Sequence, residues 1–368
     1  MRTGTGAGAE RTSPKRLLDS SSTMATSLHS GPVTYSEAIH AALAYQMEAN
    51  PRVLVYGLGV DDPTAMYGTL SGFPERFGSD RCFDTPLSED SLTGYGIGLA
   101  VAGYYPIHVH QRTDFLLLCC NQLINMAAKI KYLSNGKLGC PFVVRAITGR
   151  SWGQGSQHSQ SFHSLFANIP GLRVLTPATP QDVYNVYINV FSTQVPTIVI
   201  EHRMLYGVKG TLQARTEVPS LSQIDCGNDL TICSVSHMTL EAEKAVIALT
   251  EYGITCDHFS LVNNSEINYE PLLKSAKKTG KVLIVDHGWL NASVATTLCS
   301  GLAQGGFNGK ISLMGYKQSP CPTSRSLENL FYPTADSILG ECARLMKINA
   351  PLSKLSISQE ISSFKGPF

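Results

Sequence analysis

Apolar positions begin to recur with regular spacing at Val33. The stretch "TYSEAIHAALAYQMEAN" places apolar residues from Ile39 to Met47 at helical spacing. Thr34 is followed three residues later by Glu37, and this pairing is a capping box that marks the start of a helix. The pattern therefore predicts a helix that begins directly after Thr34.

Several apolar runs that follow are too short for helices and are typical of buried strands. They read "RVLVYGLG", "PIHVH", "PFVVRAI", "LRVLTP" and "PTIVIEH". Helical stretches lie between them, notably "DFLLLCCNQLINMAAKIKYL" and "TPQDVYNVYINVFST". Strands that alternate with helices predict a parallel sheet covered on both faces. In such sheets functional groups gather in the loops at the carboxyl ends of the strands.

The alternation lapses at about residues 203–228, which we interpret as a linker with an edge hairpin or an extended crossing. A second, smaller cycle runs from "DLTICSVS" to "TADSILGECARLMKI" and predicts another open α/β sheet. The fold class is thus α/β with two open α/β domains. The predicted boundaries are an extension (1–32), a first domain (33–205), a linker (206–228), a second domain (229–349) and a loose tail (350–368).

Composition agrees with two packed domains and narrows the choice of partners. Of 368 residues, 43% are hydrophobic and 15% are charged, as in proteins with well-filled cores. The net charge is +1 and the basic residues are scattered, so we expect neither a nucleic-acid partner nor a membrane surface. No apolar stretch reaches the ~18 residues that a membrane span needs.

The ten cysteines show no Cys-x-x-Cys spacing, and most stand inside apolar runs. Free, buried thiols are the simpler interpretation, and they predict a reducing, cytoplasmic setting. The first 30 residues are rich in Gly, Ser, Thr and Ala, which favours a disordered extension. The alternative is a transit peptide, which would place the protein in an organellar matrix, but Glu10 and Asp19 weaken that alternative.

Three segments hold residues suited to chemistry. Glu89 follows the strand-like "RCFDT" and precedes a run of small and apolar residues that we expect to be buried; alternatively it is only a first-turn acid favoured by the helix dipole. His158 and His163 lie in a long polar loop after "PFVVRAI", where catalytic groups often stand, although a solvated loop with incidental histidines has the same pattern. The segment "HVHQRTDF" is the third candidate, with an edge salt bridge between Arg112 and Asp114 as its structural alternative.

Neither half of the chain has Gly-x-Gly-x-x-Gly after a strand or a Walker-type Gly-Lys-Ser/Thr, so neither half is predicted to be a self-sufficient nucleotide site.

The motifs that support a family assignment are "FDTPLSE", "GIGLAVAGYYPI", "NQLINMAAKIKY", "QHSQSFHSLFANIPGLRVLTPATPQD" and "PTIVIEHRMLYG". In this order and spacing, they resemble the beta subunit of the thiamine-diphosphate-dependent decarboxylating component of 2-oxo acid dehydrogenase complexes, within the transketolase superfamily. The resemblance covers about residues 33–347. It implies a pyrimidine-binding transketolase-like domain followed by a transketolase C-terminal-like domain.

The resemblance also implies roles for individual residues. Glu89 matches the glutamate that hydrogen-bonds the aminopyrimidine ring of thiamine diphosphate and activates the cofactor, which would explain an acid in a buried setting. Phe115 matches the aromatic residue that packs on that ring, and Gln111 lies nearby as a further cofactor contact. His158, in "QHSQ", matches the active-site histidine that exchanges protons with the substrate-derived intermediate.

At several positions the chain departs from the family pattern. Leu58 stands where an acidic residue is usual, and Arg112 lies on the substrate side, where a guanidinium suits a carboxylate or phosphate. In the second domain, "VNNSEINYEP" and "DHGW" replace the usual segments. These departures leave the substrate and docking on a lipoyl acyltransferase core open.

Metals and partners are also implied by the resemblance. A potassium ion bound by backbone carbonyls would correspond to Val190, Phe191 and Thr193. Family members hold Mg²⁺ and the diphosphate through Gly-Asp-Gly and a downstream Asn, and this chain has no Gly-Asp-Gly. The magnesium ligands must then come from an alpha subunit, which implies an α2β2 heterotetramer.

Three fates of the reaction intermediate stay open under this interpretation: reduction of a lipoyl group, acyloin synthesis, and ketol transfer as in split transketolases. A non-catalytic scaffold subunit is the alternative from another class. The presence of both Glu89 and His158 argues against it.

Overall fold

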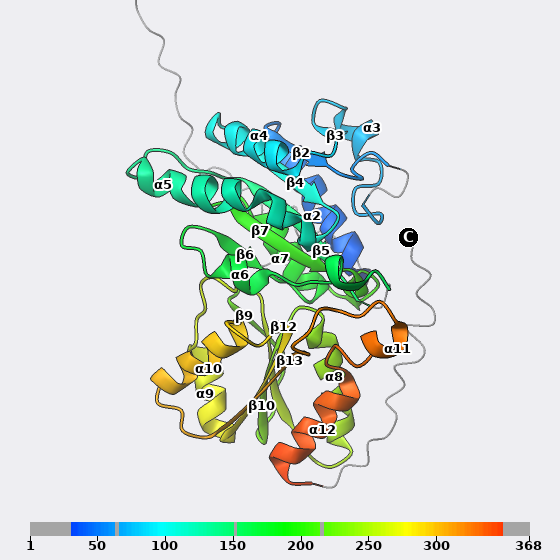
Figure 1. The fold of residues 1–368 in the computed structure, drawn as a ribbon, viewed down its shortest axis with the longest axis vertical. Coiled ribbons are helices and arrows are strands. Elements are labelled where there is room, and N and C mark those ends of the chain that lie inside the picture. Colours follow the sequence, from blue (N-terminus) through cyan, green and yellow to red (C-terminus); the bar gives the residue numbers. More distant parts are fainter. Residues whose placement is uncertain (1–30, 63–65, 151–152, 214–216, 349–368) are drawn as a thin grey trace, which may run out of the picture.

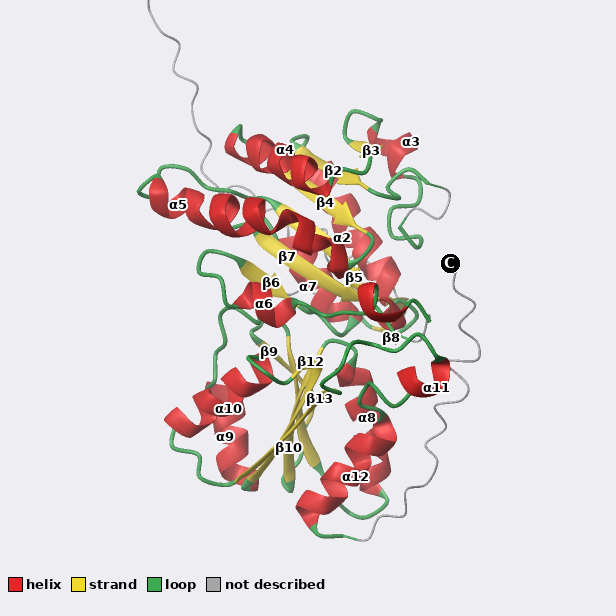
Figure 2. Ribbon diagram, in the orientation of Figure 1, coloured by secondary structure: helices red, strands yellow, loops and turns green. Residues whose placement is uncertain are grey.

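The computed structural model describes residues 31–62, 66–150, 153–213 and 217–348. Most of the predicted extension and the whole predicted tail lie outside these residues. Figure 1 shows two α/β units stacked along the long axis of the molecule, and in Figure 2 helices flank the strands of each unit.

The first unit is built on a six-stranded sheet in the order β3-β2-β4-β5-β7-β6, and every neighbouring pair is parallel. Its strands are β2 (Val53–Gly57), β3 (Cys82–Asp84), β4 (Tyr105–His110), β5 (Val143–Thr148), β6 (Arg173–Leu175) and β7 (Thr197–His202). Its α-helices are α2 (Tyr35–Ala49), α3 (Phe73–Phe77), α4 (Glu89–Val101), α5 (Ile130–Leu133), α6 (His163–Ala167) and α7 (Pro180–Asn189). Helices α2 and α7 share one core with the sheet, and α4 and α6 share another, so both faces are covered as predicted.

The second unit has the strand order β13-β12-β10-β11-β9, parallel except for the antiparallel edge strand β9. Its strands are β9 (Leu221–Asp225), β10 (Leu230–Val235), β11 (Cys256–Leu261), β12 (Lys281–Trp289) and β13 (Lys310–Tyr316). Its helices are α8 (Met238–Thr250), α9 (Glu270–Thr279), α10 (Val294–Gln304), α11 (Arg325–Glu328) and α12 (Ala335–Met346). Helices α8 and α12 pack on one face, and α9 and α10 pack on the other.

Between the two units the chain runs as an extended crossing. Strand β8 (Lys209–Gly210) pairs with β1 (Val33–Thr34), and β9 adds to the edge of the second sheet. The units also contact directly, since the amide of Thr176 donates to the carbonyl of Val262 at 2.8 Å.

Two local predictions had different outcomes. The capping box is present: Thr34 accepts from the amide of Glu37 at 3.2 Å, and the Glu37 carboxylate accepts from the amide of Thr34 at 2.7 Å. The predicted helix over residues 114–133 is a continuous helical segment but not a regular α-helix (Figure 1). It passes through 3-10 turns η3 (Thr113–Cys119) and η5 (Ala127–Lys129), with a π segment η4 (Asn121–Met126) between them, before α5. Such departures occur often at functional sites.

The small residues of α4 allow a close approach to the sheet at Gly96. A Cβ there would overlap the Tyr56 hydroxyl and lie 2.5 Å from the Phe142 ring, whereas a Cβ at Gly98 would meet nothing within 4 Å. We expect Gly96→Ala to lower the free energy of unfolding by about 1–3 kcal/mol through overpacking. Gly98→Ala should raise it by about 0.5–1 kcal/mol, because it replaces a helical glycine in open space. Urea unfolding of both variants checks this, and equal stabilities would contradict the packing of α4.

Candidate active site

The residues singled out from the sequence lie at one edge of the first sheet. Parallel strands end at the same edge, so the loops that follow them lie close together. Leu58 follows β2, Glu89 follows β3 and begins α4, Gln111 and Arg112 follow β4 and lead into η3 with Phe115, and His158 follows β5.

Glu89 is the first residue of α4 and is half-buried in this chain. The expectation that the segment would be fully buried is wrong for the chain alone: Asp90 and Gly94 are exposed, and Tyr95 is 51% exposed. Burial of this face needs surface that the single chain does not supply. Burial raises the pKa of the Cys119 thiol to about 12, and Glu89 adds to that rise, so its charge acts on η3.

Phe115 and His158 lie against each other. Their ring centroids are 5.6 Å apart at an interplanar angle of 86°, an edge-on contact between two half-buried rings. Cys119 Sγ lies 3.9 Å from the carbonyl oxygen of Phe115. Phe115 therefore contacts the thiol whose pKa the charge of Glu89 raises. An acid, an aromatic face and an imidazole thus share one edge of the sheet.

Asp114 and Gln160 hold the loop that carries His158, and no sequence pattern indicates this contact. Asp114 Oδ1 accepts from the backbone amide of Gln160 at 3.2 Å and from its side-chain Nε2 at 2.9 Å. The carbonyl of Gln160 accepts from Thr113 Oγ1 at 3.0 Å and from Thr148 Oγ1 at 3.2 Å. Burial raises the pKa of Asp114, and the bonds from Gln160 oppose that rise.

The loop after β2, which begins with Leu58, lies against Gln111 at Gly59. A Cβ at Gly59, which has a φ of +74°, would lie 2.7 Å from Gln111 Nε2. The Asp84 carboxylate accepts from the amides of Gly59 at 3.3 Å and Val60 at 2.5 Å. Asp84 therefore fixes this loop, a role that no local pattern of the sequence indicates.

Arg112 lies near a second arginine that the sequence did not single out. Arg203, just after β7, is 8% exposed, and its Cζ lies 4.4 Å from the centroid of the Tyr67 ring. Burial lowers the pKa of Arg203, and the charge of Arg112 adds to that effect. Burial also lowers the pKa of Arg112, against the influence of Tyr67. Two guanidinium groups in electrostatic contact form an environment that suits an anion.

The segment expected to bind potassium follows the C-terminus of α7. Val190 is buried, Phe191 packs edge-on against Tyr105 at 5.1 Å, and the Thr193 hydroxyl is a buried atom without a hydrogen-bond partner in the described part of the chain. The carboxyl end of a helix favours cations.

The described residues have neither a membrane-spanning helix nor a cluster of metal ligands. They contain no helix long and apolar enough to cross a membrane. They also contain no group of three or more His, Cys, Asp or Glu side chains that could hold a metal ion.

Comparison with known proteins gives two family matches. Residues 31–209 match "Transketolase, pyrimidine binding domain", and residues 222–338 match "Transketolase, C-terminal domain".

Relatives and one solved structure cover most of the chain. The beta subunit of acetoin:2,6-dichlorophenolindophenol oxidoreductase from Cupriavidus necator is 31% identical over 84% of this chain and 96% of that protein. The beta subunit of 2-oxoisovalerate dehydrogenase from Bacillus subtilis is 33% identical over 74% and 84%. A mitochondrial pyruvate dehydrogenase E1 subunit beta-1 from Arabidopsis thaliana is 28% identical over 83% and 87%. A solved structure described as a split gene transketolase, inactive beta4 tetramer, shares the fold with a TM-score of 0.70 at 18% identity, over 87% of this chain and 100% of that one.

Proposed function

Because the chain belongs to the family of beta subunits of thiamine-diphosphate-dependent 2-oxo acid dehydrogenase E1 components, we propose that Glu89 activates the cofactor and that His158 moves protons during turnover. One observation carries this proposal: Glu89, Phe115 and His158 follow three different strands, β3, β4 and β5, and so lie at the same edge of the first sheet.

These side chains fit the pyrimidine half of thiamine diphosphate. The Phe115 ring is half-buried and can take a flat heterocycle, with Glu89 as the carboxylate that shares a proton with it. Gln111 lies at the same edge and can donate a further hydrogen bond. When bound, the cofactor supplies the nucleophilic carbon that attacks the carbonyl of a 2-oxo acid. His158 lies against Phe115, where its imidazole can exchange a proton with a bound substrate.

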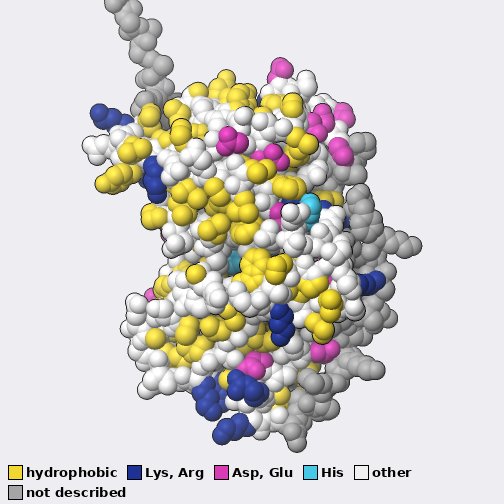
Figure 3. All heavy atoms as spheres, viewed as in Figure 1, with side chains coloured by type: hydrophobic (Ala, Val, Ile, Leu, Met, Phe, Trp, Pro, Cys, Tyr) yellow, Lys and Arg dark blue, Asp and Glu magenta, His cyan; other side chains and the backbone are white. Residues whose placement is uncertain are grey.

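The diphosphate half and its Mg²⁺ belong, in this proposal, to an alpha subunit with a Gly-Asp-Gly segment in an α2β2 assembly. Exposed apolar side chains on the helices beside Glu89 support a partner at this face, and Figure 3 shows hydrophobic side chains gathered over α4 and α5. They include Tyr95, Leu118, Met126, Tyr132 and Leu133. Docking of the assembly on a lipoyl acyltransferase core is a further part of the proposal.

The substrate is, we infer, an anionic carbonyl compound. Arg112 and Arg203 support this, because each carries a guanidinium, and such groups suit a carboxylate or phosphate. Leu58 follows β2 and adds an apolar side chain at the same edge of the sheet. Acyloin synthesis and ketol transfer are the alternatives to lipoyl reduction that such a site also supports.

Potassium at the backbone of Val190, Phe191 and Thr193 is proposed as a structural ion, supported by the helix terminus that precedes them. Removing potassium should lower the free energy of unfolding without abolishing turnover in the reconstituted complex. The described cysteines are all free, which supports a reducing compartment such as the cytoplasm.

The test is reconstitution with a chain that carries the Gly-Asp-Gly segment. Calorimetric titration of thiamine diphosphate with Mg²⁺ should show binding only when both chains are present. Turnover of pyruvate, a branched 2-oxo acid and a ketose phosphate then assigns the substrate, and Arg112→Ala should raise KM for the preferred anion. A complex that binds no cofactor would contradict the proposal and favour the scaffold alternative.

A further inference from the structure

The loop 153–164, which follows β5 and includes the first two residues of α6, carries His158 and packs against both units of the molecule. From the first unit, Asp114 holds it through Gln160. His158 itself is half-buried, with the edge of Phe115 as its ring contact. Its position is therefore determined by how the rest of the loop is anchored.

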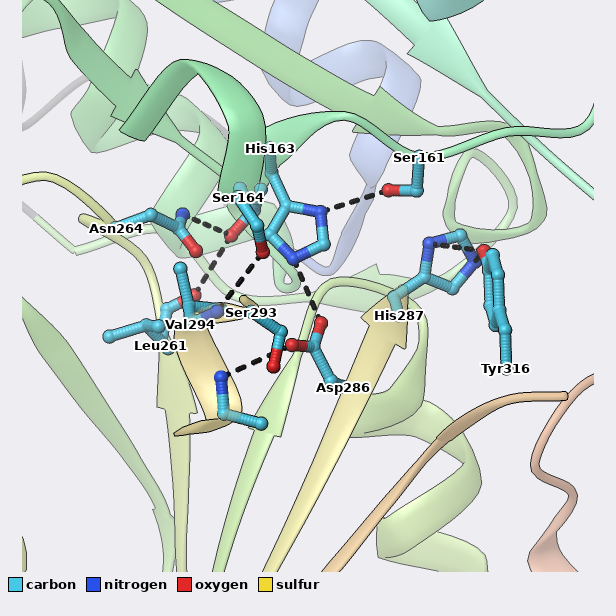
Figure 4. A network of polar contacts seen from close by, with 12 residues as sticks. Ser161, His163, Ser164, Leu261, Asn264, Asp286, His287, Ser293, Val294 and Tyr316 are labelled. Atoms are coloured by element: carbon cyan, nitrogen blue, oxygen red, sulfur yellow. Dashed lines mark hydrogen bonds and ion pairs between the residues drawn. The ribbon is translucent and has the colours of Figure 1, made fainter. Parts of the chain in front are cut away.

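From the second unit, Asp286 on β12 contacts this loop at His163 (Figure 4). Its Oδ1 lies 2.8 Å from His163 Nε2, and His163 Nδ1 lies 2.9 Å from Ser161 Oγ. Asp286 Oδ2 accepts from the amide of Ala295 at 3.2 Å. A carboxylate accepts hydrogen bonds, so the imidazole donates from Nε2 to Asp286, and its Nδ1 pairs with the Ser161 hydroxyl.

The order Ser161, His163, Asp286 has the residue types of a nucleophilic triad, but its placement excludes that role. Ser161 is 6% exposed and His163 is 1% exposed, so a substrate cannot reach the hydroxyl. Asp286 is 0% exposed, and a buried carboxylate is costly unless its partners compensate for lost water. The network therefore acts as a fixed anchor between the two units.

Further close contacts support the same anchoring. Gly155 has a φ of +71°, and a Cβ there would overlap the Thr323 hydroxyl. Arg150 Nη1 donates to the carbonyl of Pro333 at 3.4 Å, and its Cζ lies 5.4 Å from the Tyr332 ring centroid. At Gly288, a Cβ would lie 3.0 Å from His163 Cε1, so a residue without a side chain makes room for the imidazole.

We propose that Asp286 is a positioning residue for the active site: through His163 it holds the loop that carries His158, so the C-terminal domain sets the geometry of the proton-transfer group. The inference rests on the proposed function only for the role of His158. The anchoring itself is a property of this chain, and it can be measured without turnover.

The test compares Asp286→Asn with Asp257→Asn. Asparagine at 286 removes the charge and cannot satisfy both His163 and the Ala295 amide if its NH2 group faces one of them. Asp257 is the matched control, because it is a buried carboxylate of the same unit that accepts from Ser275 at 2.7 Å and Gln223 at 2.8 Å, away from the loop. Both variants should lose thermal stability.

Only Asp286→Asn should speed hydrogen exchange in residues 153–164 of the full chain. In the reconstituted complex it should lower kcat about tenfold with thiamine diphosphate affinity unchanged, as expected for a displaced catalytic group. Unchanged exchange in this loop, or an equal loss of kcat in Asp257→Asn, would overturn the proposal.

A third variant separates this inference from the proposed function. His158→Ala should lose turnover while the exchange of the loop stays close to native. If His158→Ala retains full turnover, the assigned role of His158 is wrong, while the exchange difference between Asp286→Asn and Asp257→Asn still decides whether Asp286 anchors the loop.

Discussion

Lowering the pH from 7 to 5 is expected to destabilise the folded chain steeply. Of the seven almost fully buried histidines among the described residues, six have a lowered pKa: His108, His110, His202, His237, His258 and His287. Burial lowers the pKa of every one of them, to about 4 for His110 and about 3 for His258, and well below the ordinary value for the other four. Three of them contact one another where the two units meet: His202 and His237 stack, and His287 meets both rings edge-on. The charge of Arg150 further disfavours their protonation.

The loss of stability at lower pH follows from the linkage between proton binding and folding. Below about pH 6.5 these histidines bind protons in the unfolded chain but stay neutral in the folded chain. The free energy of unfolding therefore decreases as the pH falls below that value. Each histidine contributes a loss of about 1.4 kcal/mol per pH unit until its folded pKa is reached. Several acting together can remove the ~5–15 kcal/mol that stabilises an ordinary protein within two pH units.

Urea unfolding at pH 7, 6 and 5 measures this loss. The variant His258→Gln removes one titrating group whose Nε2 lies 2.8 Å from Ser234 Oγ, so its stability should vary less steeply with pH. A native chain equally stable at pH 7 and pH 5 would contradict the neutral state of these histidines.

Arg145→Ala is expected to cost about 3–5 kcal/mol of unfolding free energy, because it leaves the Glu201 carboxylate buried without its charge partner. Both side chains are 0% exposed, and Arg145 donates to Glu201 from Nε at 2.6 Å and from Nη2 at 2.9 Å. Tyr187 and Tyr206 also donate to this carboxylate. Burial alone would lower the pKa of Arg145, but the attraction of Glu201 outweighs it and raises that pKa.

The control is the double variant Arg145→Met with Glu201→Gln, which removes both charges together and leaves an amide oxygen to accept from Tyr187 and Tyr206. Removing both charges of a buried pair costs far less than leaving one of them without its partner. Thermal unfolding of the two variants should therefore show a much smaller loss in the double variant. If Arg145→Ala is as stable as the native chain, the pair contributes nothing to the fold.

Local patterns predicted most of the fold, because the relevant forces act within one element. The capping box at Thr34 and Glu37 fixed the start of α2, and the short apolar runs correspond to β2, β4, β5, β6 and β7. The antiparallel edge strand β9 and the changes of helix type between Thr113 and Leu133 were not predicted. Both depend on contacts made after the chain is packed, so hydrophobic spacing holds no signal for them.

The candidate site was predictable to the level of single residues at strand ends. Glu89, Phe115 and His158 were named from motifs, and they gather at one edge of the sheet. The residues that hold the surrounding loops, Asp84, Gln160 and Asp286, emerged only from the structure, and so did Arg203. Their roles depend on contacts between segments far apart in the sequence, and a single sequence does not encode such pairs in any local pattern.

The most direct test of the central claim compares Glu89→Gln with Asp90→Asn in the reconstituted two-chain complex. The two acids are neighbours at the start of α4, so both substitutions remove one negative charge from the same helix terminus. If Glu89 activates the cofactor, turnover with saturating thiamine diphosphate should fall about 10²–10⁴-fold in Glu89→Gln. Asp90→Asn should remain near the native rate. Equal turnover in the two variants would contradict the account, because Glu89 would then be only a first-turn acid of α4.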